Sequence, residues 1–233
     1  MSFTVLDVPQ RSEAWHRCRL GRLTGSVAAE MCATVKTGEA AGRRNLRVRL
    51  TLERITGRSH ASEFVSTAMQ QGIDREVDAC ALYEALTGQM LSQSGFLSHV
   101  TLMAGCSLDG HVGDFEGIVE VKSPQAATHL EYLKTGLIPG NYQKQILHNL
   151  WISGARWCDW LSYQPDFPEG LQVKLVRVMR DEAAITDYEH KAVAFLEEVQ
   201  REVEVVQTLA NLRGTLELAA PGADGPMAFR RTP

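Results

Sequence analysis

Apolar residues recur at helical spacing in some segments of the chain and alternate with polar residues in others. Residues 45–57 place Leu46 and Leu50 on one face with arginines between them, which predicts a helix with one buried side. Further helices are expected to begin near residue 27 and to cover residues 73–86, 142–152 and 181–212, with strands within 91–122, 157–163 and 171–179. Helices around central strands indicate an α/β or α+β domain, with a central mixed sheet flanked by helices.

The length of the chain fits one folded unit. With 233 residues, of which 44% are hydrophobic, the chain can bury a full core. We expect residues 1–213 to form a single domain. Residues 214–233 include Pro221-Gly222 and Gly225-Pro226, so this tail is predicted to be disordered.

Composition argues against several classes of protein. The chain has no apolar run of about eighteen residues, as a membrane span would need, and its first residues lack the features of a signal peptide. The five cysteines are scattered without a C-x-x-C pair, which argues against zinc ribbons, disulfide frameworks and iron–sulfur clusters. A cytoplasmic location with reduced thiols is therefore expected.

The net charge of −4 does not suggest a nucleic-acid partner, but the distribution of charge does. Residues 11–60 contain eleven Lys and Arg against four Glu, a net charge of +7, which leaves −11 for the remainder. This asymmetry is compatible with a basic groove on an otherwise acidic body. A solvated, arginine-rich helix is the alternative explanation.

Two carboxylates and a lysine have a spacing used by metal-dependent nucleases. Asp109 is followed by Glu120 and Lys122 in a D-x10-E-x-K pattern. Carboxylates are hard oxygen ligands, and Mg²⁺ prefers them together with water and substrate phosphate. On a strand, Glu120 and Lys122 leave the same face, which would place the ammonium beside the metal to activate water or offset phosphate charge.

The setting of this pattern favours a site, although a strand with solvated surface charges is the alternative. Val119 and Val121 alternate with the two charged residues, as in a half-buried strand. The polar segment 110–114 is expected to form the turn before this strand. Asp109 would then lie at a strand end, next to Glu120 on the neighbouring strand.

Two residues outside the motif could complete a site. Glu76 lies on the helix predicted over 73–86 and would supply the third carboxylate of a two-metal site. An ordinary charged helix turn is the alternative there. Gln145 follows Tyr142 by three positions, so both face one side of a helix. The Gln145 amide could bind the attacking water or a phosphate, unless it is a surface glutamine.

The basic segment also contains a candidate phosphate site. Thr24, Gly25 and Ser26 precede an expected helix start, where free N–H groups and a partial positive charge favour anions. Arg19 could add a bidentate contact to the same phosphate. A capped helix with surface arginines is the alternative.

In this order along the chain, these segments resemble the phage lambda exonuclease family, which comprises recombination-type alkaline exonucleases with a YqaJ-like viral recombinase domain and the PD-(D/E)xK superfold. The resemblance covers about residues 13–200. Leu108 stands where the superfold often has Pro, and residues 37–60 align poorly, so duplex-entry contacts there stay unassigned. The motifs are W-H-R-C-R-L-G-R-L-T-G-S at 15–26, G-I-D-R-E-V-D-A at 72–79, C-S-L-D-G at 106–110, V-E-V-K-S-P at 119–124 and Y-Q-K-Q-I-L-H-N-L-W at 142–151.

The resemblance implies a restriction-endonuclease-like core with a metal site. Mg²⁺ is the expected cofactor, bound as two ions, with Mn²⁺ as a substitute. Lys122 and Gln145 would assist catalysis. The implied metal ligands are Asp109, Glu120, Glu76 for the second ion, and Val121 through its backbone carbonyl.

The resemblance also assigns the candidate phosphate site. Arg19, Ser26 and Ser107 stand at the positions that bind the 5′-terminal phosphate in the family, and Lys36 would add a further basic contact. The substrate implied is a double-stranded DNA end that carries a 5′-phosphate.

The activity implied is digestion of one strand of duplex DNA from 5′ to 3′ by a ring-shaped homotrimer. It would release mononucleotides and leave a 3′ single strand for a partner annealing protein. Two alternatives stay open. One is an endonuclease or junction resolvase of the same superfold, and the other is a DNA-end-binding recombination module without catalytic activity.

Overall fold

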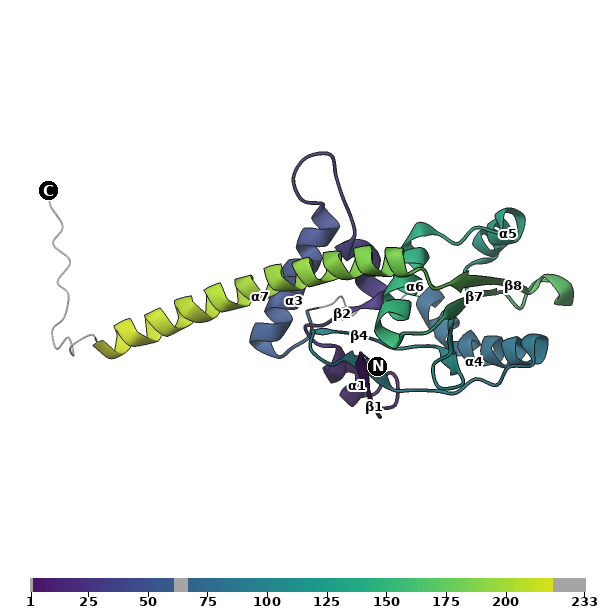
Figure 1. Ribbon diagram of the computed structural model, residues 1–233, viewed down its shortest axis with the longest axis horizontal. Helices are drawn as coiled ribbons and strands as arrows, with labels where there is room; N and C mark the ends of the chain where they lie inside the picture. The colour runs from purple at the N-terminus through teal and green to yellow at the C-terminus, as the bar shows by residue number, and fades with distance from the viewer. Residues whose placement is uncertain (1, 61–66, 220–233) are drawn as a thin grey trace, which may run out of the picture.

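The computed structural model describes residues 2–60 and 67–219 (Figure 1). Its last helix, α7 (Glu182–Ala219), starts on the body of the protein and projects far beyond it (Figure 1). Residues 214–219 are therefore helical, and the rest of the tail predicted to be disordered, residues 220–233, lies outside the described residues. No helix of the described part is both long and apolar enough to cross a membrane.

The strands of the described residues form two four-stranded sheets. The first sheet mixes strand directions, because β2 runs parallel to β4 while the other neighbours are antiparallel. Its strand order is β1 (Phe3–Leu6), β3 (Phe96–His99), β4 (Ala104–Cys106) and β2 (Leu23–Thr24).

The second sheet carries the D-x10-E-x-K pattern. β6 and β7 are parallel, and the other pairs are antiparallel. The predicted turn over 110–114 is wrong in part, because residues 110–112 pair with β6 and the chain reverses over 113–116, where Gly113 has a φ of 58°. The strand order is β5 (Gly110–Val112), β6 (Gly117–Lys122), β7 (Trp157–Tyr163) and β8 (Val173–Met179).

The helices expected from the apolar spacing are present, with shifted ends. Helices α1 and α5 and the short strands β1 and β2 were not predicted. The short helix α1 depends on a local cap, in which Ser12 Oγ accepts from the Trp15 N–H at 3.2 Å. Single 3₁₀ turns cover Gly25–Val27 and Glu169–Leu171. The helices before α7 are α1 (Glu13–Arg19), α2 (Ala28–Met31), α3 (Ala41–Thr56), α4 (Thr67–Thr87), α5 (Ala126–Thr135) and α6 (Gly140–Ser153).

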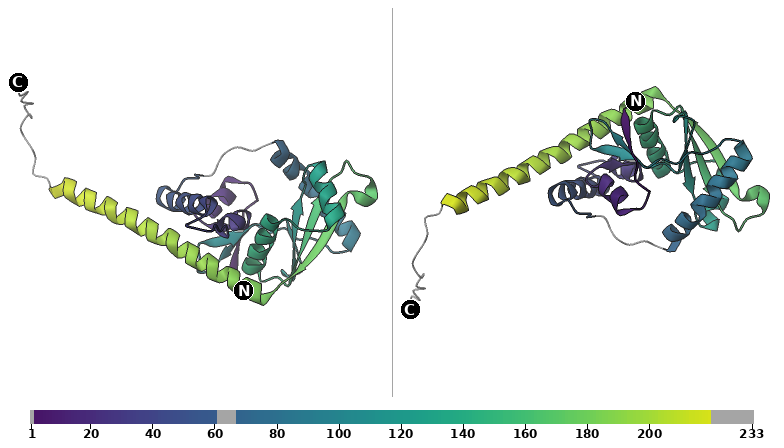
Figure 2. Two further views of the ribbon diagram at one scale, coloured as in Figure 1. Left: turned by 90° about the horizontal axis from the view of Figure 1, so that it is seen from above. Right: turned by 90° about the horizontal axis from the view of Figure 1, so that it is seen from below.

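Both faces of β6 are covered by helices. Val119 and Val121 pack with Ala79 and Tyr83 of α4, and the opposite face of the strand meets α6. Figure 2 shows the strands of this sheet between α6 and α4. The half-buried strand predicted from the alternation is therefore wrong, because α6 covers the face that was expected to meet solvent.

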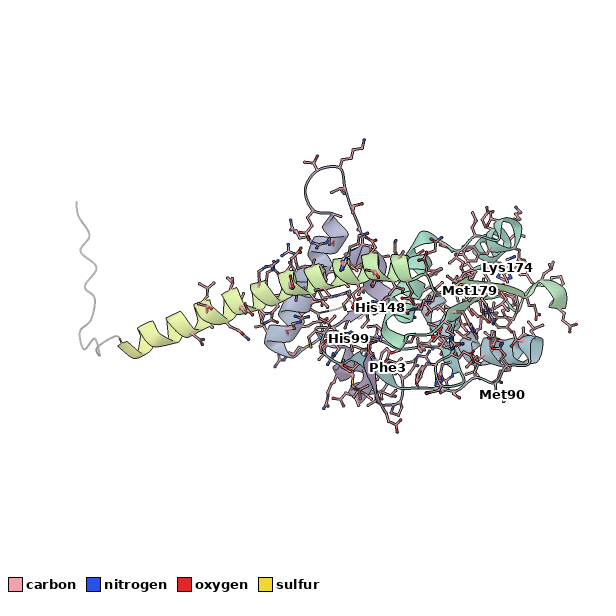
Figure 3. All side chains as sticks on the ribbon, viewed as in Figure 1. Phe3, Met90, His99, His148, Lys174 and Met179 are labelled. Carbon is pink, nitrogen blue, oxygen red and sulfur yellow. The ribbon has the colours of Figure 1, made fainter. Side chains whose placement is uncertain are left out.

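A buried histidine fixes α6 to its neighbours. His148, labelled in Figure 3, has no exposed surface. Its Nδ1 accepts from the Tyr188 hydroxyl of α7 at 2.8 Å, and its Nε2–H donates to the Gly105 carbonyl of β4 at 3.0 Å. Burial lowers the pKa of His148 to about 4, so the ring is neutral. These contacts set the position of the α6 side chains that face β6.

Candidate functional site

The two strands of the β5–β6 hairpin bring the paired carboxylates together. Gly110 lies opposite Val119 in this hairpin, so Asp109 stands beside the Glu120–Val121 step. The Val121 N–H donates to Asp109 Oδ2 at 2.6 Å. The predicted proximity of Asp109 and Glu120 therefore follows from the register of a local hairpin.

Glu120 is held by three donors from two elements. Lys122 forms an ion pair with Glu120 Oε1. Gln145 Nε2 donates to the same oxygen at 2.5 Å, and Asn149 Nδ2 donates to Oε2 at 2.9 Å. Because Gln145 and Asn149 lie one turn apart on α6, they contact both oxygens of one carboxylate. Glu120 is only 2% exposed, which excludes the alternative of a solvated surface charge.

Burial changes the protonation of these carboxyl groups. The pKa of Glu120 rises to about 7, mainly because burial penalises the carboxylate, although Lys122 opposes the shift. Burial also raises the pKa of Asp109. For Lys122, burial acts to lower the pKa, but the Glu120 and Asp109 carboxylates outweigh it and raise the pKa above its usual range. The lysine is thus an ammonium between two carboxyl groups.

Glu76 approaches this group from α4. Its carboxylate forms an ion pair with Arg11, which lies in the loop between β1 and α1. Burial raises the pKa of Glu76, and the neighbouring Asp109 raises it further. Arg11 has a φ of 67°, a left-handed conformation that is uncommon outside glycine. The sequence alone did not indicate this arginine.

Two of these carboxylates fit a divalent metal ion. Asp109 and Glu120 are adjacent and desolvated, so a cation would restore the charged form of both. Within residues 2–60 and 67–219, no three His, Cys, Asp or Glu side chains are grouped closely enough to hold an ion among themselves. Asp109 and Glu120 would therefore share the ion with water and substrate phosphate, as Mg²⁺ prefers. Glu76 would have to leave Arg11 before it could join them.

The candidate phosphate residues also lie together. Arg19 donates to Ser107 Oγ and to Ser26 Oγ, both at 3.3 Å. Trp15 supports this arrangement, because its Nε1–H donates to Ser107 Oγ at 2.8 Å and its ring lies 4.3 Å from Arg19 Cζ. Burial lowers the pKa of Arg19 to about 10, so the guanidinium is still charged at neutral pH. Two hydroxyls and a guanidinium can bind a phosphate here.

One cavity of about 180 Å³ joins the two groups of residues. It is lined on one side by Asp109, Glu120 and Lys122 and on the other by the phosphate residues. Lys36 is exposed in the loop between α2 and α3 and is not part of this lining. The other lining residues are Gln10, Arg11, Trp15, Arg19, Gly25, Ser26, Ser107, Gln145 and Asn149.

Asn149 is a site residue that the sequence analysis missed. It is 1% exposed, and its Oδ1 is buried without a hydrogen-bond partner among the described residues. The available signal was its position one helical turn after Gln145. Gly25 leaves room for this amide, because a Cβ atom at Gly25 would lie 2.4 Å from Asn149 Oδ1.

The chain is similar to known nucleases over most of its length. The profile of the YqaJ-like viral recombinase domain matches residues 14–156. The alkaline exonuclease LHK-Exo from Laribacter hongkongensis is 34% identical with a TM-score of 0.77, and the structure of LHK-Exo in complex with dAMP is 35% identical with a TM-score of 0.78. Both alignments cover 89% of this chain and 100% of LHK-Exo.

A more distant structure shares the fold. The phage-related exonuclease from Haemophilus somnus 129PT is 12% identical, with a TM-score of 0.63, and the alignment covers 79% of this chain and 96% of that one. A sequence search among curated proteins finds no match. The matches confirm the predicted α/β fold class of the PD-(D/E)xK type.

Proposed function

The chain belongs to the YqaJ-like viral recombinase family, and we propose that it is a Mg²⁺-dependent exonuclease that digests one strand of double-stranded DNA from 5′ to 3′. A nuclease role comes with the family, and nucleases of this fold generally use a divalent metal ion. Digestion from the 5′ end is supported by one observation. Asp109, Glu120 and Lys122 line the same cavity as Arg19 and Ser107. One nucleotide can thereby be held at its 5′-phosphate and cut at its next phosphodiester.

The metal would be held by Asp109, Glu120 and the backbone carbonyl of Val121, with Glu76 serving a second ion. A bound divalent cation supplies Lewis-acid charge and lowers the pKa of its water. Lys122 stays protonated between the carboxylates and offsets charge on the phosphate under attack. Gln145, within hydrogen-bond distance of Glu120, is placed to orient the attacking water.

The candidate phosphate-binding residues would determine the direction of digestion. Arg19, Ser26 and Ser107 would bind the terminal 5′-phosphate, so that a strand enters with its 5′ end first. Internal positions of a strand carry no terminal phosphate monoester, and binding there would be weaker. This favours an exonuclease over an endonuclease or junction resolvase. The retained Asp109, Glu120 and Lys122 group favours an enzyme over an inactive DNA-end-binding module.

Further properties are proposed from family membership. The protein would form a ring-shaped homotrimer, release mononucleotides and hand the remaining 3′ single strand to an annealing protein. Lys36 is proposed as an additional phosphate contact, Mn²⁺ as a substitute metal, and residues 1–213 as the exonuclease domain. Light scattering of the purified chain tests the trimer, and a monomer at micromolar concentration would contradict it.

The proposal is tested with linear and covalently closed circular duplexes of the same sequence. With Mg²⁺ we expect acid-soluble nucleotides from linear duplex with 5′-phosphate ends, slower release from 5′-hydroxyl ends, and none from closed circles or in EDTA. Nicking of closed circles would support the endonuclease instead. Absence of nucleotide release from any duplex would support the inactive module.

A further inference from the structure

A second hollow, of about 430 Å³, adjoins the candidate active site. It shares Arg19 and Ser26 with the cavity that contains the carboxylates. Its walls come from α1, the loop that follows it, and the end of α3, all inside the most basic segment of the chain. Besides Arg19, the cationic side chains that line this arginine groove are Arg17, Arg22, Arg49 and Arg58.

The charges in the arginine groove are not balanced by its acids. Arg17 pairs with Glu13, and the buried Glu53 accepts from the Gly21 N–H at 2.9 Å. The guanidinium groups of Arg22, Arg49 and Arg58 have no acceptor among the described residues. They therefore form a surface that would bind an anion with several charges.

The groove is preformed, because the loop between its lining residues Leu20 and Arg22 is fixed to α3. Gly21 has a φ of 64°, a conformation that suits glycine. Arg54 Nε donates to the Gly21 carbonyl at 2.8 Å, and a Cβ atom at Gly21 would lie 2.5 Å from Arg54 Cγ. The loop that carries Arg22 is thereby held against the helix that carries Arg49.

The place of the groove determines which strand can reach it, given the proposed function. If the 5′-phosphate lies at Arg19 and the scissile bond at Asp109 and Glu120, the digested strand runs from the groove side toward the carboxylates. The part of this strand that is still base-paired lies beyond the scissile bond, on the carboxylate side. The complementary strand is antiparallel, so its unpaired 3′ part extends past Arg19 in the direction of the groove.

We propose that the arginine groove binds the phosphate backbone of the 3′-terminated single strand that digestion exposes. The lining contains no Phe, Tyr or Trp, and its one ring is that of His16, so the contacts would be mainly to phosphates and binding would not depend on sequence. Three free guanidinium groups can neutralise about three phosphates. The groove would thus hold the product strand next to the site that generates it.

The test compares a blunt duplex with a duplex that has a long 3′ tail opposite a recessed 5′-phosphate. Binding of the full-length protein is measured by fluorescence anisotropy in EDTA, which prevents cleavage, over a range of salt concentrations. We expect wild type to bind the tailed duplex more tightly than the blunt one. In the Arg22→Ala/Arg49→Ala/Arg58→Ala variant the tailed duplex should bind about tenfold more weakly. Its slope of log K against log salt should shrink by about two.

The matched control removes three cations elsewhere, in Lys134→Ala/Arg156→Ala/Arg201→Ala, all at exposed positions. This control should retain the preference for the tailed duplex. If the variant with three groove arginines replaced fails to fold, the binding measurement is repeated with Arg58→Glu, which changes one exposed residue of the groove. An equal loss on blunt and tailed duplexes, an equal loss in the control, or tighter binding of a 5′-tailed duplex would overturn the proposal.

The proposed exonuclease activity is tested in a separate assay, which measures nucleotide release by wild type from blunt linear duplex with Mg²⁺. If wild type releases nucleotides but binds tailed and blunt duplexes equally, the proposed exonuclease activity is supported and the proposed role of the groove is refuted. A tail preference lost in the groove variant but no release by wild type would refute the exonuclease and retain single-strand binding at the groove.

Discussion

Asn149 Nδ2 donates to Glu120 Oε2 at 2.9 Å, opposite the oxygen that accepts from Gln145. This contact makes Asn149 a positioning residue for the carboxylate. Asn149→Asp would place a second carboxyl group against Glu120 and raise its pKa further. We expect the pH profile of kcat/KM to move to higher pH by about one unit, and kcat/KM at pH 7 to fall about fivefold, as the ionised fraction of Glu120 falls.

The control for this variant is Asn141→Asp, at an exposed position near the start of the same helix. It adds the same charge to α6 without a contact to Glu120. If Asn149→Asp lowered activity equally at every pH, Asn149 would act on the structure and not on the ionisation of Glu120.

Metal binding should depend on pH through Glu120. With a pKa of about 7, this group is mostly protonated at pH 6 and mostly ionised at pH 8. Only the ionised form binds a cation, so the affinity for Mg²⁺ should be about tenfold higher at pH 8 than at pH 6 and level off above it. Calorimetric titration of the protein without DNA measures this. Equal affinities at the two pH values would show that Glu120 is already ionised at pH 6 or is not a ligand.

Loss of the charged core of the site should abolish digestion. Lys122→Ala or Asp109→Ala should lower kcat by a factor on the order of 10³ or more, because Lys122 offsets charge on the reacting phosphate and Asp109 would hold the metal ion. DNA binding in EDTA should persist, because the phosphate residues remain. Lys134→Ala, on the exposed face of α5, is the control lysine. Turnover like that of wild type in either site variant would remove that residue from catalysis.

Preference for a 5′-phosphate should depend on Arg19. Arg19→Ala removes the group that contacts both Ser26 and Ser107, so the ratio of initial rates on 5′-phosphate and 5′-hydroxyl ends should fall at least tenfold, toward one. Arg156→Ala, at an exposed position outside both the cavity and the groove, should leave the ratio unchanged. An unchanged ratio in Arg19→Ala would place the 5′-phosphate elsewhere.

A buried hydrogen bond between α4 and β7 should contribute to stability. The Tyr83 hydroxyl donates to Asp159 Oδ2 at 2.8 Å, and Arg177 binds both Asp159 oxygens. Tyr83→Phe should lower the free energy of unfolding by about 1–2 kcal/mol, as measured with urea. Tyr132→Phe, whose hydroxyl has no partner among the described residues, should cost less than about 0.5 kcal/mol. A smaller loss at Tyr83 than at Tyr132 would contradict this account.

Part of the site could be predicted because it is local. Asp109, Glu120 and Lys122 belong to one hairpin and its strand, so period-two alternation and a short connection were enough to bring them together. The turn position was missed because pairing of His111 with Ile118, and a bridge to Ser92, extends the strand through residues that favour turns. Tertiary pairing overrode local preference there.

The sequence by itself determined the order of most helices and strands, the spacing of the carboxylates and the concentration of arginines in residues 11–60. Only the tertiary structure decided that Glu120 is buried under α6, that Arg11 pairs with Glu76, and that Arg19 and Ser107 share a cavity with the carboxylates. The reason is separation along the chain. Periodicity reports neighbours within one element, whereas Trp15 and Ser107 meet across 92 positions through packing that no local pattern encodes.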